Sequence, residues 1–380
     1  MTHVVVVGAG YAGAMASNRV AAAGIDGVVV TVINPHREFV ERIRLHQHLA
    51  GTGTATRPLT EVLHPSVRLR VAAVESIGER SVALDDGSSM SFDFLVYAAG
   101  SGAAPTGVGA DAVGRLDAAA RLATRLRALP AGARVLVVGG GLTGIETTAE
   151  IAERFPYLRT HLVTNRLAAT VPAAGRRVVE RTLTSLDVAV HDGLTVTEVH
   201  SDGVSVAGAS AIGADCTIWA GSFTVPDLAR RSELPVDVQG RLLTDETLVC
   251  VGNPRIVGVG DATAPPATVA GHVRMSCQSA IPTGAHGADT LIALLDDRTP
   301  RALSVGYVGQ AVSLGRSHGL IQPTGRDDRP CLPAIRGRAA ATIKEAVCRS
   351  TVMLISRAPR HYRWMPGPPR LTAEEHRVTP

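Results

Sequence analysis

The sequence predicts an α/β fold made of two units with parallel sheets, one inserted into the other, followed by a small α+β region. Two observations carry this prediction. The valine run 4–7 leads into the glycine-rich turn 8–13, and the valine run 135–138 leads into a second such turn at 139–144. A helical pattern follows each turn. We therefore expect residues 1–113 and 236–300 to form the first unit, 114–235 the inserted unit and 301–380 the C-terminal region.

The elements of both units follow from their hydrophobic periods. Strand 3–7, a helix to Ala23 and strand 28–33 form a right-handed βαβ start. A loop with a helix at 39–51, short β structure at 67–91 and a buried strand at 94–98 complete this part. For the inserted unit we expect helices at 117–129, 142–154 and 175–186 and strands at 134–138, 160–164, 188–191, 195–200, 204–207 and 216–219.

The last part of the chain returns to strands and ends in one amphipathic helix. Strands are expected within 242–261, a helix over 274–295, β-like pieces over 305–314 and a helix over 339–355. Pro282 lies inside the first of these helices. A proline in a helix interior costs about 3 kcal/mol, so we expect a kink or a new helix start there. The last helix has an apolar face among basic residues, which fits a membrane surface, a core or a homodimer interface.

Composition and charge exclude several classes of protein. Hydrophobic residues make up 45% and charged residues 19%, as is ordinary for a soluble α/β protein. No apolar run approaches the roughly 20 residues that span a bilayer, and no signal peptide precedes the first strand, so a cytoplasmic protein is expected, with peripheral membrane contact left open. The net charge is +4, but no basic and aromatic face indicates nucleic acid. Lys344 is the only lysine, which excludes most lysine chemistry.

The cysteines carry no recognisable site. Their five positions include neither a C-x-x-C nor a C-x-x-x-x-C pair, which excludes a redox disulfide of the adjacent-pair type. The same spacing offers no zinc or iron–sulfur site, so no metal is expected. Cys277 is either a reactive thiol or, as we favour, a packing residue.

Each glycine-rich turn has the residues that a dinucleotide requires. In the first turn Gly8 permits the sharp bend, Gly10 lets phosphates approach the backbone and Gly13 lets helix pack on strand. The helix N-terminus then faces the pyrophosphate. The turn at 139–144 has the same spacing. Two such turns predict two dinucleotides, a tightly held flavin (FAD) and an exchangeable nicotinamide (NADH or NADPH).

The acid that usually binds ribose after the second strand is absent from both units. In the first unit Asn34 stands there, and Glu38 or Glu41 are the alternatives. In the second unit the strand ends in Asn165 and Arg166. Arg166 could pair with a 2′-phosphate, which favours NADPH; the alternative is a solvated loop residue.

Three segments give the chain a family resemblance. They are 92–101, the second turn continued to Glu146 and Glu150, and 256–262 with its Gly260-Asp261 pair. In this order they resemble the pyridine-nucleotide oxidoreductases, flavoproteins with two Rossmann-like dinucleotide-binding domains. The resemblance spans about residues 1–320. It implies a nicotinamide domain inserted in an FAD domain, and a hydride transfer from nicotinamide to flavin.

The resemblance also implies the site residues. The helix after the Gly-Asp pair should point its N-terminus at the reduced flavin. His46 and His48 either deliver a proton to the acceptor or are structural histidines. The catalytic candidates are Gln278, His46, His48 and Glu146. The expected FAD contacts are Gly8, Gly10, Tyr11, Ala12, Gly13, Asn34, Arg44, Ala99, Gly100, Gly260 and Asp261; the expected nicotinamide contacts are Gly139, Gly141, Leu142, Thr143, Gly144, Glu146 and Arg166.

Within this family the chain is most similar to type II NADH dehydrogenases and ferroptosis-suppressor-type quinone reductases. The absent cysteine pair, Tyr307, Gln310 and residues 314–316 carry this similarity. Those enzymes have two glutamines where quinone enters; here Gln278 remains and Pro282 stands in place of the second. The expected function is transfer of electrons from NAD(P)H through FAD to a quinone or another small acceptor. The alternatives are a biosynthetic flavoenzyme on a specialised substrate, a slow redox sensor of the apoptosis-inducing-factor type, and a reductase of an acidic iron–sulfur protein.

Overall fold

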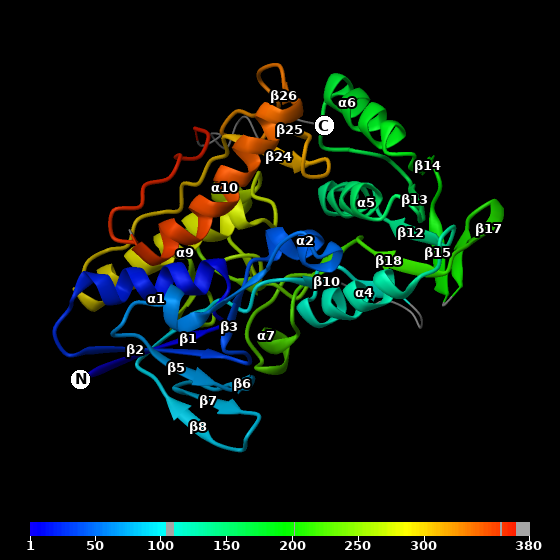
Figure 1. Ribbon diagram of the computed structural model, residues 1–380. Coiled ribbons are helices and arrows are strands. Elements are labelled where there is room, and N and C mark those ends of the chain that lie inside the picture. Colours follow the sequence, from blue (N-terminus) through cyan, green and yellow to red (C-terminus); the bar gives the residue numbers. More distant parts are fainter. Residues whose placement is uncertain (104–109, 201, 358, 370–380) are drawn as a thin grey trace.

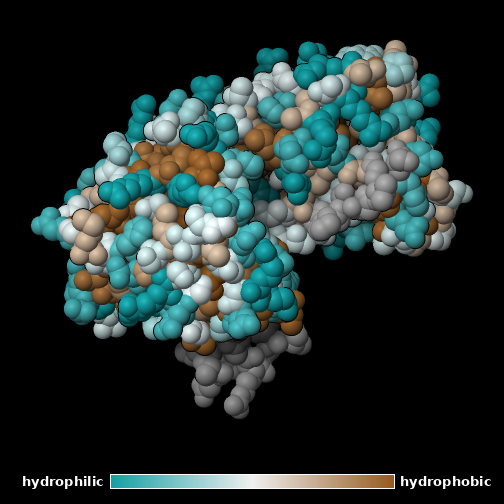
Figure 2. Space-filling view, turned by 90° about the horizontal axis from the view of Figure 1, so that it is seen from below, coloured by the Kyte–Doolittle hydropathy of each residue, from teal (hydrophilic) through white to brown (hydrophobic). Residues whose placement is uncertain are grey.

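The computed structural model describes residues 1–103, 110–200, 202–357 and 359–369. Figure 1 shows two lobes side by side, each with a sheet and flanking helices, and helix α10 (Gly337–Arg357) running across the first lobe. The expected α/β class with two Rossmann-like units is confirmed. In the space-filling view of Figure 2, hydrophobic side chains on the visible face form small clusters among hydrophilic ones.

The first lobe contains a six-stranded sheet in the order β21-β22-β9-β1-β2-β5. All neighbours are parallel except β21, which pairs antiparallel with β22. The pairing of β22 with β9 returns the chain to the sheet that β1 began, and this places the Gly260-Asp261 pair beside the first glycine turn. The strands are β1 (Thr2–Val7), β2 (Val28–Asn34), β5 (Arg68–Val71), β9 (Phe94–Tyr97), β21 (Val249–Cys250) and β22 (Asn253–Gly258).

The second lobe contains a parallel five-stranded sheet in the order β11-β18-β12-β13-β14. A three-stranded antiparallel sheet joins it, and its last strand β17 was not expected from the sequence. The strands are β11 (Asp111–Ala112), β12 (Arg134–Val138), β13 (Arg159–Thr164), β14 (Ala189–Asp192), β15 (Val196–His200), β16 (Gly203–Val206), β17 (Ala209–Gly213) and β18 (Cys216–Trp219); the helices are α4 (Leu116–Ala128), α5 (Leu142–Arg154) and α6 (Ala173–Ser185).

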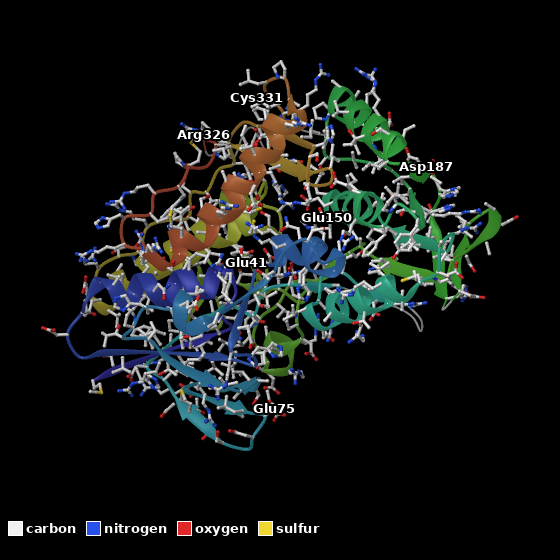
Figure 3. The ribbon with its side chains drawn as sticks, viewed as in Figure 1. Glu41, Glu75, Glu150, Asp187, Arg326 and Cys331 are labelled. Atoms are coloured by element: carbon white, nitrogen blue, oxygen red, sulfur yellow. The ribbon has the colours of Figure 1, made fainter. Side chains whose placement is uncertain are left out.

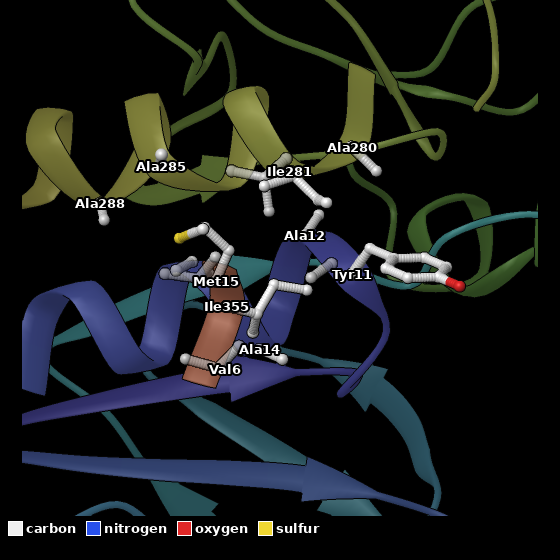
Figure 4. Close-up of a cluster of buried hydrophobic side chains, with 14 of the residues drawn as sticks. Val6, Tyr11, Ala12, Ala14, Met15, Ala280, Ile281, Ala285, Ala288 and Ile355 are labelled. Carbon is white, nitrogen blue, oxygen red and sulfur yellow. The ribbon is translucent and has the colours of Figure 1, made fainter. Parts of the chain in front are cut away.

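Helices α1 (Tyr11–Ala23) and α9 (Cys277–Leu295) pack backbone to backbone on the first sheet. A Cβ added to Gly284 would lie 2.3 Å from the carbonyl oxygen of Ala12. Figure 4 shows the apolar residues of the two helices, Met15 and Ile281 among them, facing one another. Val4 of β1 and Ala285 of α9 are fully buried. This contact fixes where the N-terminal ends of both helices meet the site.

Helix α9 runs through Pro282 without interruption, so of the two expectations, a kink or a new helix start, the new start is wrong. The proline removes a single backbone donor. The hydroxyl of Thr283 donates to the carbonyl oxygens of Ser279 (2.8 Å) and Ala280 (3.1 Å), and Pro282 itself is buried. Tertiary packing against α1 therefore outweighs the local preference.

The C-terminal region adds a small sheet and α10. Strands β24 (Gly309–Ser313), β25 (Gly319–Pro323) and β26 (Ile335–Arg336) pair antiparallel. Helix α10 packs on β24, β25 and α1 and buries Cys348, Val352 and Ile355. It therefore covers the core, while Val347 and Met353 remain half exposed. No helix in the described ranges has both the length and the hydrophobicity to cross a bilayer.

Short elements connect these layers. The helices are η1 (Arg42–Arg44), α2 (Leu45–Ala50), α3 (Leu59–Val62), α7 (Leu228–Arg231) and α8 (Ala267–Ala270); the strands are β3 (Glu38–Val40), β4 (Thr56–Pro58), β6 (Val74–Ile77), β7 (Ser81–Leu84), β8 (Ser89–Ser91), β10 (Gly102–Ala103), β19 (Phe223–Thr224), β20 (Leu242–Leu243) and β23 (Thr263–Ala264). The loop that carries η1 and α2 faces both lobes and contributes to the site below.

Candidate cofactor and active site

A cavity of about 1230 Å³ joins the two glycine-rich turns. Its lining includes Gly10 of the first turn, Gly141 of the second, Asp261 after β22 and Lys344 of α10. The two turns face the same cavity because each ends a parallel strand at its carboxyl edge, and the lobes meet along these edges. A ligand on one turn can therefore reach a ligand on the other.

The first turn has the shape that a pyrophosphate needs. Gly8 has φ of +97°, and a Cβ added to Gly13 would lie 1.9 Å from the carbonyl oxygen of Gly8. A Cβ on Gly10 would meet nothing within 4 Å, although Gly10 lines the cavity. No side chain caps the N-terminus of α1, and its first turn contains no acid. The first backbone N–H groups are thus available to an anion.

The second turn repeats this geometry. Gly139 has φ of +125°, and a Cβ added to Gly144 would lie 1.8 Å from the carbonyl oxygen of Gly139. Gly141 borders open space and caps α5 without a side-chain hydrogen bond. Thr164, the last residue of β13, and Arg166, two residues further on, also line the cavity. The residues present fit one dinucleotide at each turn.

The Gly-Asp pair places a partly buried carboxylate in the cavity, in the same lobe as the first glycine-rich turn. Asp261 accepts a hydrogen bond from the hydroxyl of Ser101 (2.6 Å) and one from the backbone N–H of Ser276 (3.2 Å). Burial raises the pKa of Asp261, while Ser101, Arg42 and Ser276 oppose the shift. Arg42 donates to the carbonyl oxygen of Ser101 (2.5 Å) and lines the cavity.

The expected FAD contact Arg44 lies elsewhere. Its guanidinium pairs with Glu345 (3.0 Å) and Glu41 (3.2 Å), and it is not among the residues that line the cavity. Arg42 and Arg44 are the first and last residues of the 3-10 helix η1. Such a helix has three residues per turn, so the two side chains point in different directions, and Arg42 is the one that lines the cavity. We assign the cavity-facing arginine of this loop to Arg42.

Helix α9 directs its N-terminus at the cavity. Ser276 caps it by accepting a hydrogen bond from the N–H of Ser279 (3.2 Å), and Cys277 and Gln278 of the first turn line the cavity. The positive end of this helix favours negative charge there. Burial raises the pKa of the Cys277 thiol to about 11, which keeps it protonated. This supports packing rather than reactivity for Cys277.

An ion pair stands between the two turns. The carboxylate Oε1 of Glu146, on α5, lies 2.9 Å from the Nζ of Lys344, on α10, and also accepts the backbone N–H of Ser313 (3.0 Å). Lys344 donates to the carbonyl oxygen of Ala311 (2.9 Å). Burial opposes both charges, yet Lys344 and its neighbours lower the pKa of Glu146, and Glu146 raises that of Lys344. Both groups are therefore charged.

Lys344 is a site residue that the sequence reasoning missed. It is the only lysine of the chain, but no spacing in the sequence links it to Glu146. Only the packing of α10 against β24 brings it to the cavity. The feature of the sequence that could have indicated a role for Lys344 is that it is a single lysine in a chain whose other basic residues are arginines and histidines.

The two histidine candidates separate. His46 lines the cavity with Nδ1 3.9 Å from Oε2 of Glu146, whereas His48 is half-buried and does not line it. Burial lowers the pKa of His46 to about 4 despite Glu146. A neutral imidazole is a weak proton donor at pH 7, so the charged pair is better suited to this role.

The remaining candidates divide by position. Those that line the cavity are Gly10, Tyr11, Ala12, Asn34, Gly100, Gly139, Gly141, Leu142, Thr143, Glu146, Arg166, Gly260, Asp261 and Gln278. Gly8, Gly13 and Gly144 lie behind it and shape the turns, and Ala99 is also outside the lining. Asn34 accepts the backbone N–H of Ala9 (3.0 Å), so its amide supports the turn as well.

Comparison with known proteins agrees with this geometry. The family model described as pyridine nucleotide-disulphide oxidoreductase matches residues 2–284. The chain belongs to this family. It is an oxidoreductase that uses a pyridine nucleotide, and the expected cofactor set, FAD with NADH or NADPH, is the set that this family uses.

Several relatives share most of the chain. An NADH dehydrogenase-like protein of Mycobacterium tuberculosis is 30% identical over 382 residues, covering 91% of this chain and 93% of the relative. The demethylphylloquinone reductase of Synechocystis is 28% identical and covers 61% of each chain. The solved sulfide:quinone oxidoreductase of Aquifex aeolicus (TM-score 0.79, 15% identity, 94% of this chain and 92% of that one) has the same fold. So does NDH2 of Plasmodium falciparum in complex with NADH (TM-score 0.76, 14% identity, 95% and 98%).

Proposed function

We propose that this protein transfers electrons from NAD(P)H, through FAD, to a small apolar acceptor of the quinone class. The observation that carries the proposal is the single cavity shared by both glycine-rich turns and by the Glu146–Lys344 pair. A cavity of this kind lets two ring systems and an acceptor meet around one charged pair. The names of the relatives, which include a demethylphylloquinone reductase, point to the same acceptor class.

Each part of the cavity has a proposed task. FAD, when bound, takes two electrons from the nicotinamide and releases them to the acceptor. The turn at Gly10 and Asp261 hold the pyrophosphate and the sugar chain of FAD, and the turn at Gly141 holds the pyrophosphate of NAD(P)H. Glu146 orients the nicotinamide at the border between the two. The N-terminus of α9 stabilises negative charge in the FAD half.

The lining of α10 favours an apolar acceptor. Ile343, Val347 and Leu354 line the cavity on one side of this helix. Lys344 lies among them and can donate a hydrogen bond to an acceptor oxygen while its charge is balanced by Glu146. Such a surface suits a flat ring with carbonyl oxygens better than a highly charged metabolite.

The test separates nucleotide from acceptor. The purified protein is reduced anaerobically with NADH and with NADPH, and the bleaching of the flavin absorbance is followed. Soluble quinones of increasing side-chain length are then mixed with the reduced protein. Rapid reoxidation by quinones, faster than by oxygen, supports the proposal. A long-lived reduced form that no quinone reoxidises would favour the redox-sensor alternative instead.

Arg166 supports NADPH as the donor. Its backbone N–H donates to the hydroxyl of Thr164 (3.2 Å), which holds the residue at the end of β13 beside the cavity. A guanidinium at this position can pair with a 2′-phosphate, and the acid that usually ends this strand is absent from the sequence.

A further inference from the structure

Helix α5 carries three glutamates on one face. Glu146, Glu150 and Glu153 are spaced by four and three residues, so their side chains follow one another along the helix. Glu146 lines the cavity, Glu150 is fully buried behind it and Glu153 is half-buried. Figure 3 places Glu150 between α5 and α2, inside the molecule. The three carboxyl groups thus lead from the cavity toward the surface.

Glu150 is a buried carboxyl group whose two oxygens are not both satisfied by hydrogen bonds. Its Oε1 accepts a hydrogen bond from the hydroxyl of Thr52, but Oε2 has no hydrogen-bond partner among the described residues. Arg316 contacts this carboxyl only loosely, with Nη1 3.9 Å from Oε2. Buried Glu41, by contrast, is paired with both Arg44 and Arg57. A carboxylate left in this position is costly, so Glu150 can take up a proton readily.

Burial, more than the neighbouring charges, brings the protonation of Glu150 near neutral pH. Burial raises its pKa to about 7, and the negative charges of Glu153 and Glu146 act in the same direction. The hydrogen bond from Thr52 and the charge of Arg316 oppose the shift. Glu150 therefore exists in both protonation states at physiological pH.

Glu150 lies between a partly exposed arginine on its outer side and the Glu146–Lys344 pair on its inner side. On the outer side Arg316 contacts Glu150 and also Glu345 (3.3 Å). Because the Arg316 side chain is partly exposed, only this one side chain separates Glu150 from solvent. On the inner side Glu146 lies one helical turn away and holds Lys344 at the cavity. His46 also contacts Glu146 and is neutral.

We propose that Glu150 relays protons from solvent at Arg316 to the Glu146–Lys344 pair, which protonates the acceptor. The inference rests on the proposed function and adds a residue outside the cavity to it. Reduction of a quinone to a hydroquinone takes two electrons and two protons, and NAD(P)H supplies both electrons but one proton. The second proton comes from water. As an O–H bond forms on the acceptor, an N–H bond of Lys344 breaks, and Lys344 regains its proton from Glu150 through Glu146, after which water reprotonates Glu150.

The first experiment compares two acceptors in the variant Glu150→Gln. Quinone needs protons, whereas ferricyanide takes single electrons and no proton. We expect unchanged flavin reduction by NAD(P)H and unchanged ferricyanide reduction, a roughly 10- to 100-fold slower reduction of quinone, and a larger solvent isotope effect on that step. The control Glu180→Gln alters an exposed carboxylate of α6 that pairs with Arg176, and should change none of these rates. Equal slowing of both acceptors, or none, would overturn the relay.

The second experiment observes the carboxyl directly, without turnover. Infrared titration should show a protonated carboxyl band that disappears near pH 7 and is absent in Glu150→Gln. Because the relay needs protonated Glu150, the rate of quinone reduction should fall over the same pH range in which the band disappears. In Thr52→Val the loss of the hydrogen bond destabilises the carboxylate, so both midpoints should move to higher pH. A band and pH profile unmoved by Thr52→Val would contradict the relay. If wild-type flavin is not reduced by NAD(P)H at all, the proposed function fails, and that result is separate from the infrared titration.

Discussion

Glu146 and Lys344 form an ion pair of 2.9 Å between helices that are far apart in the chain. Both side chains are largely buried, at 10% and 14% exposure. Each holds the other in its charged form against the effect of burial. The pair therefore connects the inserted lobe to the C-terminal helix at the cavity, and both of its groups are charged near neutral pH.

Removing the cation should destabilise the protein strongly. Lys344→Met leaves the buried Glu146 carboxylate without its cation, with only the backbone N–H of Ser313 donating to it, which should cost about 3–5 kcal/mol in the free energy of unfolding. The double variant with Glu146→Gln should regain much of this loss, because no unpaired charge remains. Denaturant unfolding of the four proteins gives the coupling energy. Additive losses in the double variant would show that the pair is not coupled.

The two glycine-rich turns should separate the two nucleotides. In Gly141→Leu the side chain enters the open space beside the second turn, so FAD should remain bound while reduction by NAD(P)H is lost. Gly10→Leu should lose FAD but still bind nicotinamide nucleotide. The ratio of flavin to protein and a nucleotide titration measure both effects. Loss of FAD in Gly141→Leu with the fold intact would mean that the turns are assigned the wrong way round.

Arg166 should decide between the two nicotinamides. Arg166→Ala removes the cation that we place near the 2′-phosphate, so kcat/KM for NADPH should fall about ten-fold, which corresponds to about 1.4 kcal/mol. The value for NADH should stay nearly constant. Stopped-flow reduction of the flavin by each nucleotide provides the comparison. A parallel fall for both would indicate a structural role for this arginine.

Glu150 should make the protein less stable as the pH rises. Its folded pKa of about 7 lies above the ordinary value of 4.5, so the folded state holds the proton more tightly. The stabilisation is complete below about pH 4.5 and is lost as the pH rises through 7. Between pH 4 and pH 8 the stability of Glu150→Gln should gain about 3 kcal/mol relative to the wild type. Parallel unfolding curves across this range would argue against a raised pKa.

The cysteines should differ sharply in reactivity. Cys331 is exposed, whereas burial raises the pKa of Cys216 and Cys277 to about 11 and also raises that of Cys250 and Cys348. Alkylation of the native protein at pH 8 should therefore label Cys331 first. Mass spectrometry of the digested protein identifies the labelled site. Fast labelling of Cys277 would restore the reactive-thiol alternative.

The hydrophobic pattern of short segments was enough to predict the positions of most helices and strands. Strand β12 and helix α5 begin and end where their hydrophobic periods predict, and the glycine-rich turn between them follows from spacing alone. Strand β17 was missed because the segment 209–213 is short and mostly exposed. The new helix start that Pro282 suggested did not occur, because packing against α1 is a tertiary effect that helix propensity does not include.

The amino-acid sequence by itself determined the two nucleotide turns, because their glycines act within six residues of chain. It did not determine which charged residues meet at the cavity. Arg42 rather than Arg44 faces it, and Lys344 pairs with Glu146, because η1 turns one side chain inward and α10 folds back over β24. Such pairs join distant segments, and only the packed structure brings them within hydrogen-bond distance and removes the water that would otherwise screen them.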